Sequence, residues 1–186
     1  MAMNDDIEIL AVEIANAARK SFLELFKSGE RFYYCTLYTT GEGHAPSISA
    51  WSWEALEREA VKQASRSNRS PCEMANLLKW SYADSPYCCF GEENFTAVYK
   101  CFAQRPYMWT LEEDEWQEEL LLRLKAMELA LKKLANEELF SLNQPRDSIC
   151  IVVEIMPPEA INTQIALRLN DPSSPAFQQW LEEAAE

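Results

Sequence analysis

The sequence lacks most of the patterns that nucleotide-binding and nucleic-acid-binding proteins use. Its 186 residues include 4 glycines, and no G-x-G-x-x-G or G-K-[ST] loop is present. Loops of that kind need clustered glycines to cradle phosphates. Basic residues are also scarce, since 17 Lys and Arg stand against 30 Asp and Glu and the net charge is -13. Nucleic acids and anionic membranes require a cationic face, so we expect neither as a partner.

Long hydrophobic runs are missing as well. No apolar stretch approaches the roughly 20 residues that a membrane-spanning helix needs. The first residues show no cationic stretch that leads into an apolar segment, which is the pattern of a secretion signal. We therefore expect a protein that stays in the cytoplasm.

Cysteine is present, but not in metal-binding patterns. The six cysteines include no C-x-x-C pair, and a single His cannot complete the usual Cys/His zinc sets. A chain that is 48% hydrophobic does not depend on disulfides, so we expect reduced, mostly buried thiols and no metal or cofactor. The adjacent pair Cys88-Cys89 could be redox-active or bind a soft metal, although simple packing is the more common role.

The residues that are present predict a single folded domain over residues 1–186, because the length suits one hydrophobic core. Apolar residues at three- and four-residue steps predict helices. The expected helices cover residues 5–27, 53–64, 112–138, 159–169 and 174–185, with short helices and loops in the aromatic middle third.

Two further segments predict β-structure. Residues 31–52 are rich in aromatic and β-branched residues on both sides of a glycine-containing turn, which is typical of a β-hairpin. Residues 148–156 are almost continuously apolar, which is typical of a strand in the middle of a sheet. The sequence thus predicts an α+β fold with a small, mainly antiparallel sheet covered by five or six helices.

A catalytic centre is not evident. His44 beside the hairpin turn and Cys35 on the preceding strand could form a nucleophilic pair. However, a strand cysteine is more often a small buried side chain, and a histidine in a turn is usually solvated. The carboxylates include no E-x-x-H set. We therefore predict a protein that is not an enzyme.

Acidic residues are concentrated near the predicted start of the long helix at residue 112. Residues 112–186 carry 16 acidic and 6 basic groups, whereas residues 61–111 carry 4 and 6. The helix dipole favours acids in the first turn, so a solvated helix start is the simplest interpretation. A concentrated negative field can also steer a cationic protein partner into contact. The candidate contact acids are Glu112, Glu113, Asp114, Glu115, Glu118 and Glu119.

The aromatic segment 79–87 is a second candidate for a contact surface. Trp and Tyr are favoured as anchors in interfaces, and they are favoured equally in protein cores. Both interpretations stay open for this segment. Its candidate contact residues are Trp80, Tyr82, Asp84 and Tyr87.

Several segments resemble DUF4303, a bacterial domain of unknown function. The resemblance covers nearly the whole chain and rests on the order of loose motifs. These motifs are RFYYCTLYT at 31–39, Pro46 after a glycine turn, WEAL at 53–56, KWS at 79–81, IVVEI at 151–155 and LRLN at 167–170. The resemblance implies a small cytoplasmic bacterial protein. Proteins similar to it are associated with secreted-toxin loci, where such domains are inferred to be immunity proteins.

The expected function is therefore an immunity protein that binds a cognate antibacterial toxin, for example a nuclease, on its basic face and occludes it. A second hypothesis is a small ligand-binding domain or enzyme with a pocket in the aromatic middle third. That pocket would hold His44, Tyr82, Asp84 or Cys88. A third hypothesis is a scaffold protein that associates with copies of itself.

Overall fold

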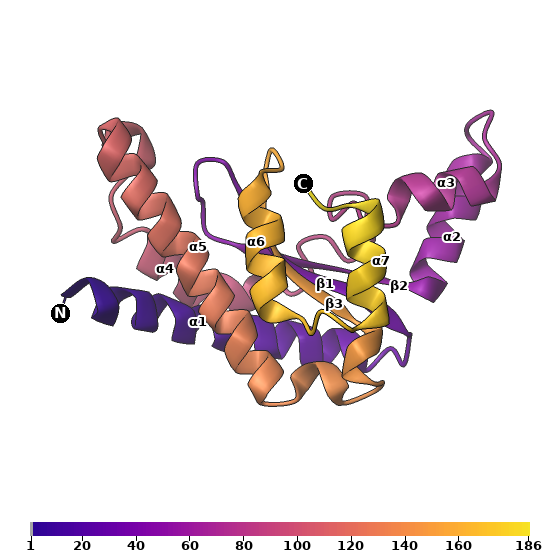
Figure 1. Ribbon diagram of the computed structural model, residues 1–186, viewed down its shortest axis with the longest axis horizontal. Helices are drawn as coiled ribbons and strands as arrows, with labels where there is room; N and C mark the ends of the chain where they lie inside the picture. Colours follow the sequence, from indigo (N-terminus) through magenta and orange to yellow (C-terminus); the bar gives the residue numbers. More distant parts are fainter. Residues whose placement is uncertain (1) are drawn as a thin grey trace.

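A computed structural model describes residues 2–186 of the chain, with side chains from residue 6 onward, as a three-stranded sheet surrounded by helices (Figure 1). The strands are β1 (Phe32–Thr40), β2 (Ser47–Ser52) and β3 (Cys150–Met156). The helices are α1 (Ala2–Phe26), α2 (Trp53–Ala64), α3 (Pro71–Leu78), α4 (Thr96–Phe102), α5 (Glu113–Asn136), α6 (Ala160–Leu169) and α7 (Pro175–Glu183). Short 3₁₀ turns occupy Glu92–Phe95, Met108–Thr110, Leu139–Ser141 and Arg146–Ser148.

The α+β class is confirmed, but the prediction of a mainly antiparallel sheet was wrong. The strand order is β2-β1-β3, with β2 antiparallel and β3 parallel to the central β1. Between β2 and β3 the chain runs through α2 to α5, and a long crossover of this kind lets a strand enter parallel to its neighbour. The described part of the chain holds seven α-helices and not five or six, because α3 and α4 both form in the middle third.

Strand β3 lies at the edge of the sheet and not in its middle, which corrects a second expectation. Two buried asparagines of the α6 region form hydrogen bonds with backbone groups on its free edge. The Asn162 side chain accepts a bond from the Ile155 N–H at 2.9 Å and donates to the Ile155 carbonyl at 3.3 Å. Asn170 does the same at Ile151, at 3.0 and 2.7 Å. The two amides therefore replace a fourth strand, and β3 can be apolar on both faces without an exposed edge.

We expect Asn170→Ala to lower the free energy of unfolding by about 2 kcal/mol, because it leaves a buried N–H and a buried C=O of Ile151 unpaired. Urea denaturation measures this change. Asn76→Ala, at an exposed position of α3, is the matched control and should change stability by less than about 0.5 kcal/mol. Equal effects of the two substitutions would contradict the edge-capping role.

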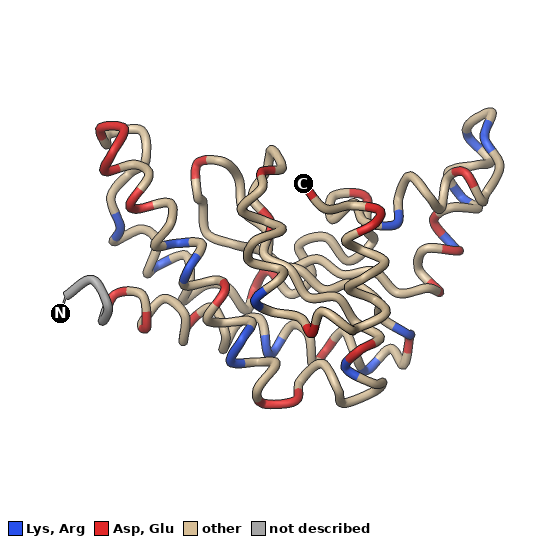
Figure 2. The backbone as a smooth tube through the Cα atoms, in the orientation of Figure 1, with Lys and Arg blue, Asp and Glu red and all other residues tan. Residues whose placement is uncertain are grey.

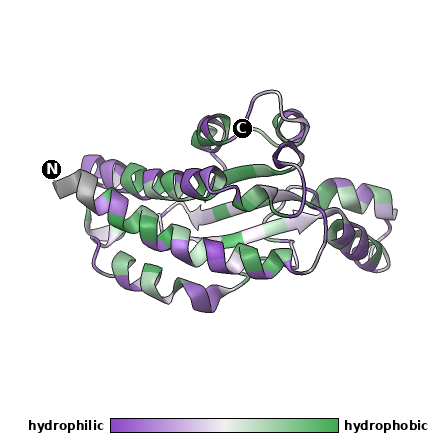
Figure 3. Ribbon diagram, turned by 90° about the horizontal axis from the view of Figure 1, so that it is seen from below, coloured by the Kyte–Doolittle hydropathy of each residue, from purple (hydrophilic) through white to green (hydrophobic). Residues whose placement is uncertain are grey.

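The sheet separates two layers of core. On one face, β1 and β3 place Leu37 and Val153 against Phe22 of α1 and Leu131 of α5. On the other face, Tyr34, Trp51 and Val152 share a cluster with residues of α2, α3 and α7. In Figure 3 the strands lie between helices that each carry both apolar and polar residues, as amphipathic helices with one buried stripe do.

Two parts of the molecule extend away from the sheet and diverge, at the upper left and upper right of Figure 1. One is the beginning of α5, where acidic residues gather (Figure 2). The other is the pair α2 and α3, whose connection contains Arg66 and Arg69. Among residues 2–186, no helix has the length and apolar character that crossing a bilayer would require.

Candidate partner-binding surface

Five of the six predicted contact acids are exposed in the first turns of α5 or at its N-cap. Within the described residues, none of these five carboxylates forms an ion pair with a lysine or arginine. The Glu115 carboxylate accepts a bond from the N–H of the N-cap residue Glu112 at 3.4 Å, and Gln117 donates to Glu113 at 3.0 Å. The beginning of α5 therefore presents negative charge that is not neutralised locally. The five acids are Glu112, Glu113, Asp114, Glu115 and Glu118.

The sixth acid, Glu119, is buried and belongs to an arginine network. The Arg123 Nε donates to its carboxylate at 2.7 Å, and Arg105 donates through Nε at 3.0 Å and NH2 at 2.5 Å. Burial acts to raise the pKa of the Glu119 carboxyl, but the bonds from the two arginines outweigh it and hold the pKa below its ordinary value. Glu119 is therefore ionised and internally paired.

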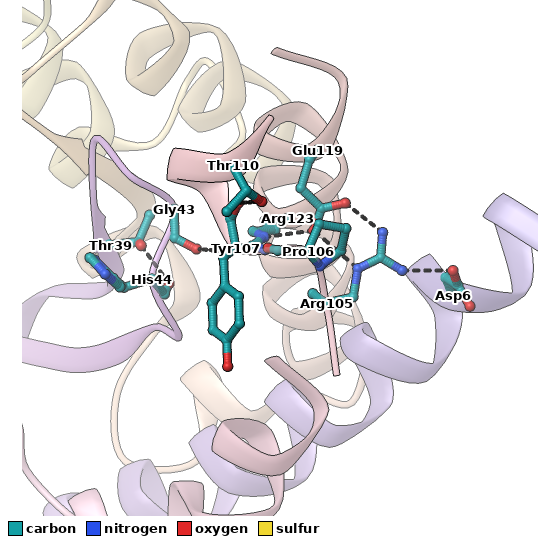
Figure 4. Close-up of polar contacts among 10 residues, drawn as sticks. All are labelled: Asp6, Thr39, Gly43, His44, Arg105, Pro106, Tyr107, Thr110, Glu119 and Arg123. Carbon is teal, nitrogen blue, oxygen red and sulfur yellow. Dashed lines mark hydrogen bonds and ion pairs between the residues drawn. The ribbon is translucent and has the colours of Figure 1, made fainter. Parts of the chain in front are cut away.

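The remaining donors of Arg123 fasten two loops to α5 (Figure 4). One NH group donates to the carbonyl of Gly43 at 2.8 Å, and the other donates to the carbonyl of Pro106 at 2.7 Å. Gly43 has a φ of +61°, which favours glycine, and a Cβ there would lie 3.0 Å from the Leu120 Cδ1, so the leucine side chain would have to shift. The network thus fixes the β1–β2 connection and the segment before α5 against the helix.

These fixed loops enclose a hollow of about 270 Å³. Its lining is mostly apolar and aromatic, with Arg123 and the exposed groups Glu42 and His44 at its border. The His44 ring is held by the Thr40 hydroxyl, 2.6 Å from its Nδ1. The other lining residues are Ala45, Tyr99, Phe102, Ala103, Pro106, Tyr107, Met108 and Trp109.

Beside this hollow two large aromatic side chains are exposed to solvent. Tyr107 and Trp109 stack on each other at 4.9 Å between ring centroids, and they are 59% and 72% exposed. Trp109 also borders a second hollow together with Glu42, Glu113 and Trp116. We call the group of Glu42, Tyr107, Trp109, Glu113 and Trp116 the Trp109 surface. It places exposed aromatic rings next to the Glu113 carboxylate, which forms no ion pair within the described residues, and next to Glu42, whose carboxylate lies 3.4 Å from the His44 Nε2.

The other predicted contact residues lie elsewhere, against β1. The Trp80 ring meets Tyr33 edge-on at 5.2 Å, and its Nε1 donates to Glu183 of α7 at 2.7 Å. Tyr82 and Tyr87 are likewise half-buried, while Asp84 is exposed and accepts a bond from Ser81 at 2.6 Å. The structure does not bring this group together with the acids of α5, because α7 and the α5 N-terminus are far apart (Figure 1).

The residues proposed for catalysis do not converge. Cys35 is fully buried in the sheet, where burial raises the pKa of its thiol, whereas His44 is exposed in the β1–β2 connection. Tyr82, Asp84 and Cys88 do not line the hollow that contains His44. In the described part of the chain, no three His, Cys, Asp or Glu side chains gather as a metal site would require.

The expectation of mostly buried thiols was wrong for four of the six free cysteines. Cys35 and Cys150 are buried, Cys88 and Cys101 are half-buried, and Cys72 and Cys89 are exposed. Alternation along a strand marks the two buried thiols, but it gives no information on cysteines in loops and short helices.

The comparison with known families gives a clear match. Residues 14–171 fit the family model described as "Domain of unknown function (DUF4303)". The chain belongs to the DUF4303 family. The matched region contains the whole sheet, α2 to α6 and every residue of the Trp109 surface, while α7 lies beyond it. No curated protein and no solved structure matches this DUF4303 chain.

The sequence-based prediction missed Tyr107 and Trp109 as contact residues. Tyr107 and Trp109 follow Pro106 and stand directly before the acidic run. Met108, which stands between them, is buried, so the local sequence does not separate exposed from packed apolar residues here.

Proposed function

We propose that this DUF4303 protein is an immunity protein of the cytoplasm that binds and neutralises a cognate secreted antibacterial toxin by covering it. The observation that carries the proposal is the Trp109 surface. Exposed large apolar side chains mark interaction sites, and Trp and Tyr are over-represented among the residues that dominate binding energy. The rings are held by loops that Arg123 fastens, so binding costs little ordering of the chain.

The negative charge around the rings favours a partner with a positively charged contact face. Glu42 and Glu113 border Trp109, and Glu115 and Glu118 continue the negative field along α5. A partner with a basic contact face gains attraction and a higher association rate, whereas an acidic partner is repelled. Nucleases have such faces because they bind phosphates, so a nuclease toxin suits this surface.

The direct experiment mixes the purified protein with the toxin encoded by the adjacent gene and measures complex formation by calorimetry. Co-expression of both proteins in a sensitive bacterium then measures protection. We expect a complex together with growth rescue. Neither a complex nor protection would overturn the proposal.

We expect Trp109→Ala to weaken toxin binding by at least about 30-fold, which corresponds to about 2 kcal/mol, because it removes the most exposed ring of the surface. Leu77→Ala on α3 is the matched control, since Leu77 is also exposed, at 56%, but lies on a different helix. Circular dichroism verifies that both variants fold. Equal affinities of the two variants would place the contact elsewhere.

A triple variant with Glu113, Glu115 and Glu118 changed to Gln tests the role of charge separately. We expect the association rate at low salt to fall about tenfold, with a smaller fall at 0.5 M salt, because screening already weakens the field there. Stopped-flow tryptophan fluorescence measures this rate. An association rate that does not change would assign these acids to solubility alone.

The second hypothesis, a ligand-binding domain, has one observation in its favour, since the hollow contains the sole histidine and aromatic residues of the middle third. Its volume of about 270 Å³ lies just below the roughly 300 to 1,000 Å³ of typical small-molecule sites. A hollow of that size fits one inserted side chain of a partner protein better. Self-association without any toxin complex would instead favour the scaffold hypothesis.

A further inference from the structure

The adjacent thiols of Cys88 and Cys89 converge on one hydroxyl group, that of Tyr38. The Tyr38 oxygen lies 2.8 Å from the Cys89 Sγ and 3.3 Å from the Cys88 Sγ, and the two sulfurs are 3.9 Å apart. Cys89 is exposed and Cys88 is half-buried, so the pair is accessible from solvent. The Trp109 surface uses none of these groups.

The backbone and the neighbouring ring hold the thiols in this arrangement. Cys89 has a φ of +59°, which is uncommon for a residue with a side chain, and its N–H donates to the Ile48 carbonyl of β2 at 3.0 Å. Tyr38 lies on β1 and stacks on Tyr82 at 4.1 Å, so its hydroxyl is fixed in position. An unusual conformation that the surroundings maintain is a reason to search for a function there.

A disulfide between the two thiols is disfavoured by geometry. The Cα atoms of consecutive residues are about 3.8 Å apart across a trans peptide, whereas disulfides usually join Cα atoms about 4.4 to 6.8 Å apart. A strained disulfide is reduced easily. The pair therefore persists as two thiols.

The separation of the sulfurs suits a metal ion that binds both. With metal–sulfur bonds of about 2.3 Å, a distance of 3.9 Å between the sulfurs gives a sulfur–metal–sulfur angle of about 116°, between the tetrahedral and trigonal values. Soft thiolate ligands select d¹⁰ ions such as Zn²⁺ over hard ions such as Mg²⁺. We propose that Cys88 and Cys89 form a two-thiolate site for a thiophilic d¹⁰ cation, with the Tyr38 hydroxyl as a hydrogen-bond donor to the bound thiolates.

The chemistry of binding is a simple exchange. Each thiol releases one proton to water as its sulfur bonds to the cation, so one divalent ion replaces two protons. Two protein ligands are fewer than a closed structural site has, so the remaining positions are open to water and the ion can exchange.

The test uses Cd²⁺ alone as the probe on the reduced full-length protein, with calorimetry and ultraviolet thiolate-to-metal charge-transfer absorbance as readouts. We expect one equivalent to bind. Cys88→Ser and Cys89→Ser should each weaken binding by at least about 100-fold, and Tyr38→Phe by about tenfold, as second-shell changes do. Cys72→Ser, at an exposed lone cysteine of α3, is the matched control and should bind as the wild type does. Absence of binding to the wild type, or a Cys88→Ser or Cys89→Ser variant that binds as tightly as the wild type, would overturn the proposal.

A second measurement uses only the wild-type protein, so its outcome does not depend on whether a variant folds. Phenylarsine oxide reacts with two neighbouring thiols, forming two As–S bonds and one molecule of water while its As=O bond is lost. Mass spectrometry of peptides from the treated wild-type protein should show one arsenic bridge in the peptide that contains both cysteines. An unmodified Cys88–Cys89 peptide would overturn the proposal, and this outcome is independent of any toxin.

Discussion

We expect Glu119→Gln to lower the free energy of unfolding by about 3 kcal/mol, because it removes the buried carboxylate that pairs with the buried Arg123 and the half-buried Arg105. The substitution keeps the volume of the side chain, so the loss comes from charge and hydrogen bonding and not from a cavity. Its amide group also places a donor where Arg105 and Arg123 need acceptors. Arg123, which holds the Gly43 and Pro106 loops, then lacks its carboxylate partner.

Urea denaturation at pH 7 measures the effect of Glu119→Gln, with Glu118→Gln as the matched control. Glu118 is the preceding residue of the same helix but is exposed, so its substitution should change stability by less than about 0.5 kcal/mol. Because the pKa of Glu119 is lowered in the folded state, its stabilisation is present above the ordinary carboxyl pKa of 4.5 and is lost as the pH falls through the folded value. The difference between the two variants should therefore shrink in acid. Equal stability of both variants at pH 7 would contradict the network.

The sequence was sufficient for the three strands and for α1, α2, α5, α6 and α7, but not for the bounds of α3 and α4 or for the sheet topology. Periodicity placed β1, β2, α2, α5 and α6 within a few residues of their observed bounds, because burial of one helix stripe or one strand face is a local property. The position of β3 depends on which side chains complete its edge. Asn162 and Asn170 lie eight positions apart on the α6 segment, which spans about 12 Å and matches four residues of a strand. The composition of the sequence does not show that this helix spacing fits the spacing of the strand.

The candidate site was predictable to a similar extent. The acids of α5 form one exposed group, as the charge distribution indicated, but Glu119 faces inward. Its spacing to Arg123 is that of an i,i+4 ion pair, which is visible in the sequence. The second partner, Arg105, comes from another segment, and its arrival depends on the fold. Likewise, no local pattern distinguishes the packed ring of Trp80 from the exposed ring of Trp109.

The second large effect is expected at Glu154, a carboxylate that β3 directs into the core face near Tyr34 and Thr36. It is 8% exposed, and the Tyr34 hydroxyl donates to it at 2.5 Å. Within the described residues, no lysine or arginine forms an ion pair with Glu154. Burial, which outweighs the bond from Tyr34, together with the nearby Glu186 carboxylate, raises its pKa to about 7.

This shift makes Glu154 a cost to stability at neutral and alkaline pH. A raised folded pKa means that the folded protein retains a proton which the unfolded chain, with a pKa of 4.5, has already released. The contribution of Glu154 is therefore most favourable below pH 4.5 and is lost as the pH rises through about 7. A difference of about 2.5 pKa units corresponds to about 3 kcal/mol above that range.

Glu154→Gln should consequently stabilise the protein at pH 8 by about 3 kcal/mol relative to the wild type, and by less than about 1 kcal/mol at pH 5. Gln retains an acceptor for the Tyr34 hydroxyl but carries no charge to bury. Urea denaturation of both proteins at the two pH values measures the difference, in which the titration of groups that do not interact with Glu154 cancels. Glu159→Gln, at an exposed position shortly after β3, is the matched control and should show no such pH dependence. A Glu154→Gln effect of equal size at pH 5 and pH 8 would mean that Glu154 does not titrate between them in the folded protein, and that its burial is compensated by a partner other than Tyr34.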